Sequence, residues 1–230
     1  FRELVEQPLV QLVSVMDHAP GQRQFARMEK YREHYMGKYH LSPAEMDRFV
    51  SEQLANSARH SDQQRAAIVD ICRSRDLALA SHDDATLEHV TESADYGMAI
   101  AEFPTTFEAA EASHARGLKV LMGAPNIVRG GSHSGNIAAA DLAQRGVLDI
   151  LSSDYYPASL LQAALGLAEQ GNGYDLPRAI ATISLAPARA AGLDDRGEIG
   201  VGLRADLVQA QVHKGQPVIG QVWRQGRRVF

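Results

Sequence analysis

The most constraining feature of the sequence is a regular alternation of short apolar segments with longer segments of helical character. The four clearest apolar segments are residues 77–80, 98–101, 119–122 and 147–151. Each is followed by polar or turn-forming residues and then by a helical pattern. Strands that alternate with helices in this way form parallel βα units. The sequence therefore predicts an α/β fold in which the polar ends of the strands carry the chemistry.

The regions around this alternation have a different character. Residues 9–16 are apolar and rich in β-branched side chains, for which we expect a buried parallel strand. Residues 22–75 are charged and helical, and a capping box at residues 42–45 starts one of the helices that we expect in this insertion. Residues 197–230 contain two strand-like runs, which predict a small β element outside the βα layer.

Composition narrows the function classes. The 230 residues carry a net charge of −5, which argues against a general nucleic-acid-binding protein. The single cysteine, Cys72, excludes a disulfide framework and a cysteine-based zinc site. No apolar run approaches the roughly 20 residues that a membrane helix needs. We therefore expect a cytoplasmic protein with no nucleic-acid or membrane partner.

Two of the nine histidines stand apart by position, because His18 and His82 each follow an apolar segment. A neutral imidazole at the end of a barrel strand can coordinate a metal ion. Capping of the loop is the alternative for both residues. Six of the others lie in helical segments, the insertion or the tail, where a solvated or packed histidine is the better interpretation.

Asp154 follows the apolar segment 147–151 after two serines. A carboxylate at this position can bind a metal ion and accept a proton from water, which combines Lewis-acid and general-base catalysis. It can equally serve as the N-cap of the helix that we expect after Pro157 and that should end near Gly171. The residues alone do not choose between these two roles.

A glycine-rich polar loop at residues 129–136 is a candidate anion site. Glycines let the backbone approach a ligand, N–H and hydroxyl groups donate hydrogen bonds, and a helix that should be capped near Ser134 follows. The candidate substrate-binding residues of the loop are Arg129, Gly130, Gly131, Ser132, His133 and Asn136. No Gly-Lys-Ser/Thr sequence follows, so the loop is not a P-loop, and a plain turn is the alternative.

These motifs resemble those of the amidohydrolase superfamily. The similar segments are LVSVMDHAPGQRQF (12–25), SHDDAT (81–86), AEFPTT (101–106), GAPNIVRGGSHSGN (123–136), SSDYYPASLL (152–161) and the tail GEIGVGLRADLV (197–208). The resemblance implies that residues 1–196 form part of a (β/α)8 barrel of the amidohydrolase type, with a helical insertion at about 22–75. Residues 197–230 would be a segment of a small β domain.

The branch of the superfamily that looks most similar hydrolyses a phosphorylated ribose phosphonate and releases pyrophosphate in the carbon–phosphorus lyase pathway of phosphonate catabolism. This resemblance implies a divalent metal ion, zinc or manganese, with His18, His82 and Asp154 as ligands. Asp154 would also be catalytic, as the general base toward the attacking water. The loop at 129–136 would hold phosphate or phosphonate, and a homo-oligomer is compatible with this interpretation.

Two alternatives stay open. One is a C–N hydrolase of the same superfamily, such as a deaminase or cyclic amidase, although the sequence of the loop at 129–136 favours a phosphorus substrate. The other is an inactive fragment, because the first-strand metal pair and the bridging carboxylate of the superfamily have no counterpart before His18. We therefore expect the C-terminal part of such an enzyme, insoluble or inactive when produced alone and weak in metal binding. Glu102 and Asn126, near other strand ends, are secondary site candidates.

Overall fold

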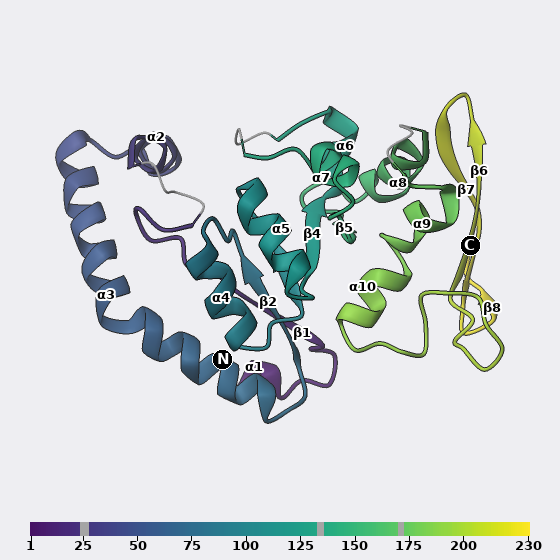
Figure 1. The fold of residues 1–230 in the computed structure, drawn as a ribbon, viewed down its shortest axis with the longest axis horizontal. Helices are drawn as coiled ribbons and strands as arrows, with labels where there is room; N and C mark the ends of the chain where they lie inside the picture. The colour runs from purple at the N-terminus through teal and green to yellow at the C-terminus, as the bar shows by residue number, and fades with distance from the viewer. Residues whose placement is uncertain (24–27, 133–135, 170–172) are drawn as a thin grey trace. The chain divides into compact units, whose positions relative to one another are not determined.

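The computed structural model describes residues 1–23, 28–132, 136–169 and 173–230. The chain divides into two compact units, Phe1–Ala112 and Ser113–Phe230. Figure 1 shows the order of the helices and strands along the chain, coloured from the N-terminus to the C-terminus. The two units are described separately below.

The first unit contains three parallel strands, β1 (Leu12–Val15), β2 (Ala78–His82) and β3 (Ile100–Glu102). β2 lies between the other two, with Val13 opposite Leu79 and His82 opposite Glu102. Its residues 79–81 are buried. The prediction of parallel βα units is confirmed here. The observed strands β2 and β3 extend one or two residues further toward the polar end than predicted, because the backbones of Ser81 and His82 continue the ladder.

β1 differs from the expected buried strand at residues 9–16. Only residues 12–15 form the strand, and none of its four side chains is fully buried. Leu9 is 91% exposed and Met16 is 53% exposed. Among the described residues, β1 pairs with β2 alone. A β-branched run therefore identified the strand correctly, but its burial depends on neighbours that periodicity does not reveal.

Five helices accompany these strands. They are α1 (Arg2–Val5), α2 (Met28–Tyr39), α3 (Pro43–Arg73), α4 (Leu87–Asp95) and α5 (Phe107–Ala115), the last of which contains the boundary between the units. The predicted capping box of α3 is present, since Ser42 Oγ accepts from the Glu45 N–H and the Glu45 carboxylate accepts from the Ser42 N–H. Met46 near the start of α3 and Val69 near its end are buried, whereas most of the residues between them are exposed.

A buried ion pair connects the loop after β1 to the turn after β2. Arg23 and Asp84 are 6% and 1% exposed, and the guanidinium donates directly to the carboxylate. Ser81 Oγ and Ser93 Oγ donate to the other carboxylate oxygen, over 2.6 Å and 3.1 Å. Arg23 also contacts Glu92 on α4 at 3.0 Å. The buried charge of Asp84 is thus neutralised and fully hydrogen-bonded, which a carboxylate at this depth requires.

The second unit contains two parallel strands, β4 (Lys119–Gly123) and β5 (Ile150–Ser152), with Leu121 opposite Ile150. Its helices are α6 (Ala124–Arg129), α7 (Ala139–Gln144), α8 (Ser159–Glu169), α9 (Leu176–Ala181) and α10 (Leu185–Ala190). A separate antiparallel sheet is formed by β6 (Leu207–His213), β7 (Gln216–Arg224) and β8 (Arg227–Arg228). The predicted β element in the tail is confirmed.

The segment after β4 corrects the prediction in one respect. The predicted loop was expected to begin at residue 129, but Arg129 is the last residue of a helix, α6, which begins at Ala124, because Pro125 is well tolerated in the first turn of a helix. The helix ends at Arg129, and Gly130 adopts the left-handed conformation (φ 76°) that terminates it. The predicted cap near Ser134 and helix end near Gly171 lie outside the described residues.

None of the described helices combines the length and the hydrophobicity needed to cross a lipid bilayer.

We predict that Asp84→Ala destabilises the protein by about 3–5 kcal/mol, because Arg23 would keep its charge in a buried position without its main partner. The free energy of unfolding, measured by urea denaturation, checks this. Asp62→Ala is the matched control, since the side chain of Asp62 is 98% exposed and should contribute nothing measurable. Equal stability of the two variants would contradict the structural role of Asp84.

Candidate metal centre

Three side chains at the ends of β1 and β2 converge in the first unit. Nε2 of His18 lies 3.2 Å from Oδ2 of Asp83, and Nε2 of His82 lies 3.3 Å from the same oxygen. All three ligand atoms lie within 4.8 Å of one another. Asp83 is buried, and both histidines are half-buried. Two imidazole nitrogens and a carboxylate oxygen are a common donor set for zinc and for other divalent transition metals.

The spacing of these atoms fits a metal ion. A tetrahedral ion with bonds of about 2.0–2.1 Å holds its ligand atoms roughly 3.3–3.4 Å apart. The two nitrogen-to-oxygen distances in the group are 3.2 Å and 3.3 Å. The group supplies three protein ligands, and a catalytic site leaves a fourth position for water or substrate. The donors present are therefore able to hold one divalent ion.

A carboxylate behind His82 fixes its ring. Nδ1 of His82 lies 2.9 Å from Oε2 of Glu102, and the same oxygen accepts a 2.5 Å hydrogen bond from Ser14 Oγ. The ring of Phe103 meets the imidazole edge-on at 5.4 Å between centroids. With Nδ1 protonated toward Glu102, Nε2 keeps its lone pair toward Asp83. This is the carboxylate–histidine arrangement that orients metal-binding histidines.

The contact between His82 and Glu102 also shifts the pKa values of both side chains. Burial acts to lower the pKa of His82, but the hydrogen bond to Glu102 and the charges of Asp83 and Glu102 outweigh it and raise the pKa above its ordinary value. Burial acts to raise the pKa of Glu102, yet the hydrogen bonds from His82 and Ser14 hold it below its ordinary value. Glu102 therefore stays ionised and serves as the acceptor for the imidazole.

The backbone after β2 sends two adjacent carboxylates in different directions. Asp83 has a φ of 57°, in the left-handed region that Asp tolerates better than most residues. Its N–H donates to the carbonyl of Glu102 at 2.9 Å, and its side chain meets the two histidines. Asp84 instead pairs with Arg23. Neither aspartate was named as a ligand from the sequence, and the structure brings Asp83 to the histidines.

The remaining predicted ligand lies in the second unit. Asp154 follows β5, is exposed, and has a φ of 48°. Its carboxylate packs close to Gly123 at the end of β4, where an added Cβ would lie 3.3 Å from Oδ2. A side chain at position 123 would thus need the Asp154 carboxylate to move by a few tenths of an ångström. The role of Asp154 as a third ligand and general base stays a prediction.

The predicted substrate loop is partly used for local structure. The N–H groups of Gly130 and Gly131 donate to the carbonyls of Ile127 and Asn126 at the end of α6. Arg129 is exposed, and its guanidinium donates to the Tyr155 hydroxyl at 3.1 Å.

The other loop candidates have separate outcomes. Ser132 and Asn136 are half-buried, and their role as substrate ligands stays a prediction. His133 lies outside the described residues. The secondary candidate Asn126 accepts from the N–H of Ala139 through Oδ1, so it anchors the start of α7.

Comparison with known proteins connects these observations to a family. A profile described as "Amidohydrolase family" matches residues 17–230. The chain belongs to the amidohydrolase family. The predicted family is therefore confirmed, and the fold is of the amidohydrolase type.

The α-D-ribose 1-methylphosphonate 5-triphosphate diphosphatase of Escherichia coli (strain K12) is 61% identical over the whole chain. The chain spans 61% of the length of that protein.

Solved structures support the fold. An amidohydrolase from Thermotoga maritima MSB8 aligns with a TM-score of 0.55 at 15% identity, over 95% of this chain and 62% of the other. The A. niger ochratoxinase aligns with a TM-score of 0.54 at 15% identity, over 70% of this chain and 43% of the other. The α/β architecture of the described residues is consistent with part of the barrel of these proteins.

Sequence reasoning missed Asp83 as a member of the group and named Glu102 only as a secondary candidate. A signal for both was present. Asp83 directly follows a histidine at a strand end, and Glu102 ends the next strand, opposite His82. Adjacent parallel strands bring the residues at their carboxyl ends together at one edge of the sheet. Asp83 and Glu102 were therefore recognisable as site candidates from the sequence.

We predict that Glu102→Ala weakens zinc binding by about 10–100-fold, because His82 loses the acceptor that orients its ring. Isothermal titration calorimetry checks this without any need for activity. Glu102→Gln should recover part of the affinity, since its amide oxygen can still accept from Nδ1. The control is Glu108→Ala, an exposed glutamate on α5. Unchanged affinity in Glu102→Ala would remove Glu102 from the centre.

Proposed function

We propose that the protein is a metal-dependent diphosphatase that hydrolyses α-D-ribose 1-methylphosphonate 5-triphosphate and releases pyrophosphate. The observation that carries this proposal is the 61% identity along the whole chain to the E. coli diphosphatase. The group of His18, His82 and Asp83 adds a physical reason, because it matches the donor chemistry of a divalent-metal hydrolase. We propose zinc or manganese as the ion.

The chain's own residues suggest a division of roles. His18, His82 and Asp83 would hold the ion, with Glu102 orienting His82. When bound, the ion would supply Lewis-acid stabilisation of the charge that develops on phosphate oxygens. Asp154 would take the proton of the attacking water and contribute a further ligand. The water oxygen attacks a phosphorus atom of the triphosphate chain. The P–O–P anhydride bond from that phosphorus to the terminal two phosphates breaks, and pyrophosphate leaves.

Arg129 is the residue that we propose for holding the phosphate or phosphonate oxygens. Its guanidinium is exposed and its described partner, the Tyr155 hydroxyl, is neutral. An arginine that keeps its charge unneutralised is suited to a planar, two-point contact with phosphate. Ser132, His133 and Asn136 would add neutral donors from the same loop. The N–H groups of Gly130 and Gly131 already donate to carbonyls at the end of α6. If these two glycines contact the substrate, they would do so through other backbone atoms.

The function is tested by incubating the ribose methylphosphonate triphosphate with the purified protein, in a form that also carries the first-strand metal pair of the superfamily, and measuring pyrophosphate. We predict metal-dependent release that a chelator abolishes and added zinc or manganese restores. Asp154→Asn should lower kcat by about 10²–10⁴-fold, as expected for loss of a general base. No pyrophosphate from this substrate, together with hydrolysis of a cyclic amide or an aminopyrimidine, would instead support a C–N hydrolase.

A separate prediction concerns Arg129. Arg129→Ala should raise KM for the triphosphate about tenfold or more and leave zinc affinity unchanged, because a substrate contact is lost and no ligand is altered. Arg129→Lys should recover only part of the effect, since a lysine supplies charge without the two-point geometry. If KM does not change in the alanine variant, the role of Arg129 is confined to its contact with Tyr155.

A further inference from the structure

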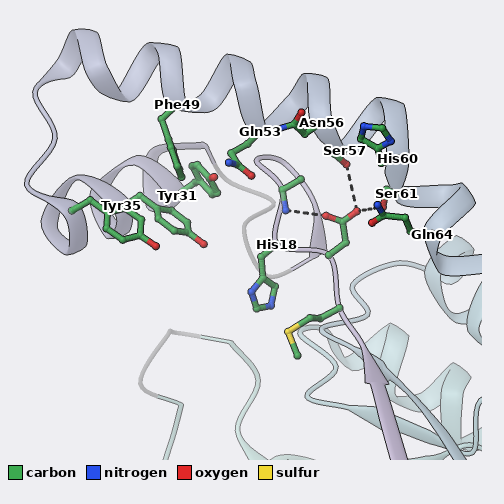
Figure 2. A pocket seen from close by; sticks show the side chains of 14 residues that line it. His18, Tyr31, Tyr35, Phe49, Gln53, Asn56, Ser57, His60, Ser61 and Gln64 are labelled. Carbon is green, nitrogen blue, oxygen red and sulfur yellow. Dashed lines mark hydrogen bonds between the residues drawn. The ribbon is translucent and has the colours of Figure 1, made fainter. Parts of the chain in front are cut away.

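A cavity of about 570 Å³ lies in the first unit between the loop after β1 and the helices α2 and α3. His18 of the candidate metal centre borders it, as Figure 2 shows. A volume of this size is typical of a small-molecule site. The question is which ligand chemistry its lining would favour.

The face of α3 that lines the cavity is polar. Its lining residues follow helical spacing and are Gln53, Asn56, Ser57, His60, Ser61 and Gln64. A helix face turned toward its own domain is normally apolar. Figure 2 shows this row of side chains along α3 above the space that His18 also borders. A polar row of this kind requires partners, which protein groups, water or a ligand must supply.

Only part of this row has partners in the protein. Ser57 and Ser61 hydrogen-bond to Asp17 at 3.5 Å and 2.6 Å. Within the described parts of the chain, the side-chain amides of Gln53, Asn56 and Gln64 make no hydrogen bond to protein. Gln53 is half-buried. These amides can donate and accept, which suits a ligand with hydroxyl groups.

Aromatic rings form the other wall. Tyr31, Tyr35 and Tyr39 of α2 and Phe49 of α3 line the cavity and contact one another, with centroid distances of 4.5 Å between the first two and 5.4 Å from Tyr35 to Phe49. Tyr31 is 1% exposed and supports the cluster from within, so the partly exposed rings of Tyr35 and Tyr39 offer the apolar surface and the hydroxyl groups at its margin. Such a surface packs against the C–H face of a ring-shaped ligand, while the amides reach its hydroxyl groups.

The charges of the cavity disfavour an anion. Among its described lining residues there is no lysine or arginine, and Asp17 contributes a carboxylate. Arg65 nearby is engaged by Glu92 at 2.5 Å. Lys38 lies over the rings of Tyr35 and Tyr39 but does not line the cavity. Asp17 is in turn paired with Arg65 at 3.5 Å, so the described lining offers neutral hydrogen-bonding groups and no free lysine or arginine for a phosphate.

We propose that this cavity binds the uncharged polyhydroxylated ring of the substrate, a pentose sugar, through the amides of α3 and the tyrosines of α2. The proposal deepens the proposed function and rests on it for the identity of the sugar as ribose. It assigns Gln53 and Asn56 as specificity-determining residues that recognise the sugar hydroxyl groups.

Two measurements test this, one of which does not depend on catalysis. In saturation-transfer NMR, methyl β-D-ribofuranoside should receive magnetisation from the protein, and Gln53→Leu should remove the transfer. In kinetics, Gln53→Leu should lower kcat/KM for the ribosyl triphosphate about tenfold, the effect of leaving a buried polar group unpaired. Its kcat/KM for inorganic triphosphate, which has no sugar, should stay within about twofold of the parent.

Matched variants separate recognition from folding. Gln63→Leu makes the same change on the same helix at an exposed position outside the cavity lining, and should leave both measurements unchanged. Asn56→Ala, at an exposed position, provides a second variant and should act in the same direction as Gln53→Leu.

The outcomes distinguish the two proposals. If Gln53→Leu and Asn56→Ala both leave hydrolysis intact, and the parent shows no NMR transfer to the riboside, the sugar site is overturned. The proposed function stands in that case. Equal loss for both triphosphates also overturns it. NMR transfer that depends on Gln53, in a protein that hydrolyses neither triphosphate, supports the sugar site and overturns the proposed function. Stronger transfer to a free nucleobase than to the riboside would assign the cavity to a different ligand.

Discussion

The buried carboxylate of Asp84 is the constraint on which the first unit depends. A charge at 1% exposure requires full compensation, and Arg23, Ser81 and Ser93 provide it from three different segments. These contacts fix the turn after β2. Next to it in the same turn, Asp83 has a left-handed backbone conformation, and its side chain contacts the histidines. A structural ion pair thus holds the turn that also carries a ligand of the candidate metal centre.

The sequence predicted the architecture well where the signals were local. Alternating apolar and helical segments identified the strands β2 to β5, and the capping box at Ser42 marked a helix start that the structure contains. The β element of the tail was read from its turns and strand patterns. Signals of this kind act over a few residues, so they survive without knowledge of the tertiary fold.

The parts that sequence reasoning did not resolve depend on distant partners. Asp83 and Asp84 have the same side chain and adjacent positions, and both are buried; the location of Arg23, 61 residues away from Asp84 in the chain, decides which one forms the ion pair. The exposure of β1 depends in the same way on what lies beside it. The glycines at 130 and 131 were interpreted from composition as ligand donors, yet their N–H groups complete α6. Each case is decided by the competition for hydrogen bonds that folding creates.

The distribution of positive charge connects the two proposals. In the first unit, the arginines near the centre are already neutralised, Arg23 by Asp84 and Glu92, and Arg65 by Glu92 and Asp17. Such pairs stabilise the fold and occupy the guanidinium groups of Arg23 and Arg65. Arg129 in the second unit contacts a neutral phenol and keeps its charge for a ligand. The first unit therefore offers amides and tyrosines for a neutral sugar ring and metal ligands for an anionic chain, while Arg129 of the second unit is a separate candidate for phosphate oxygens.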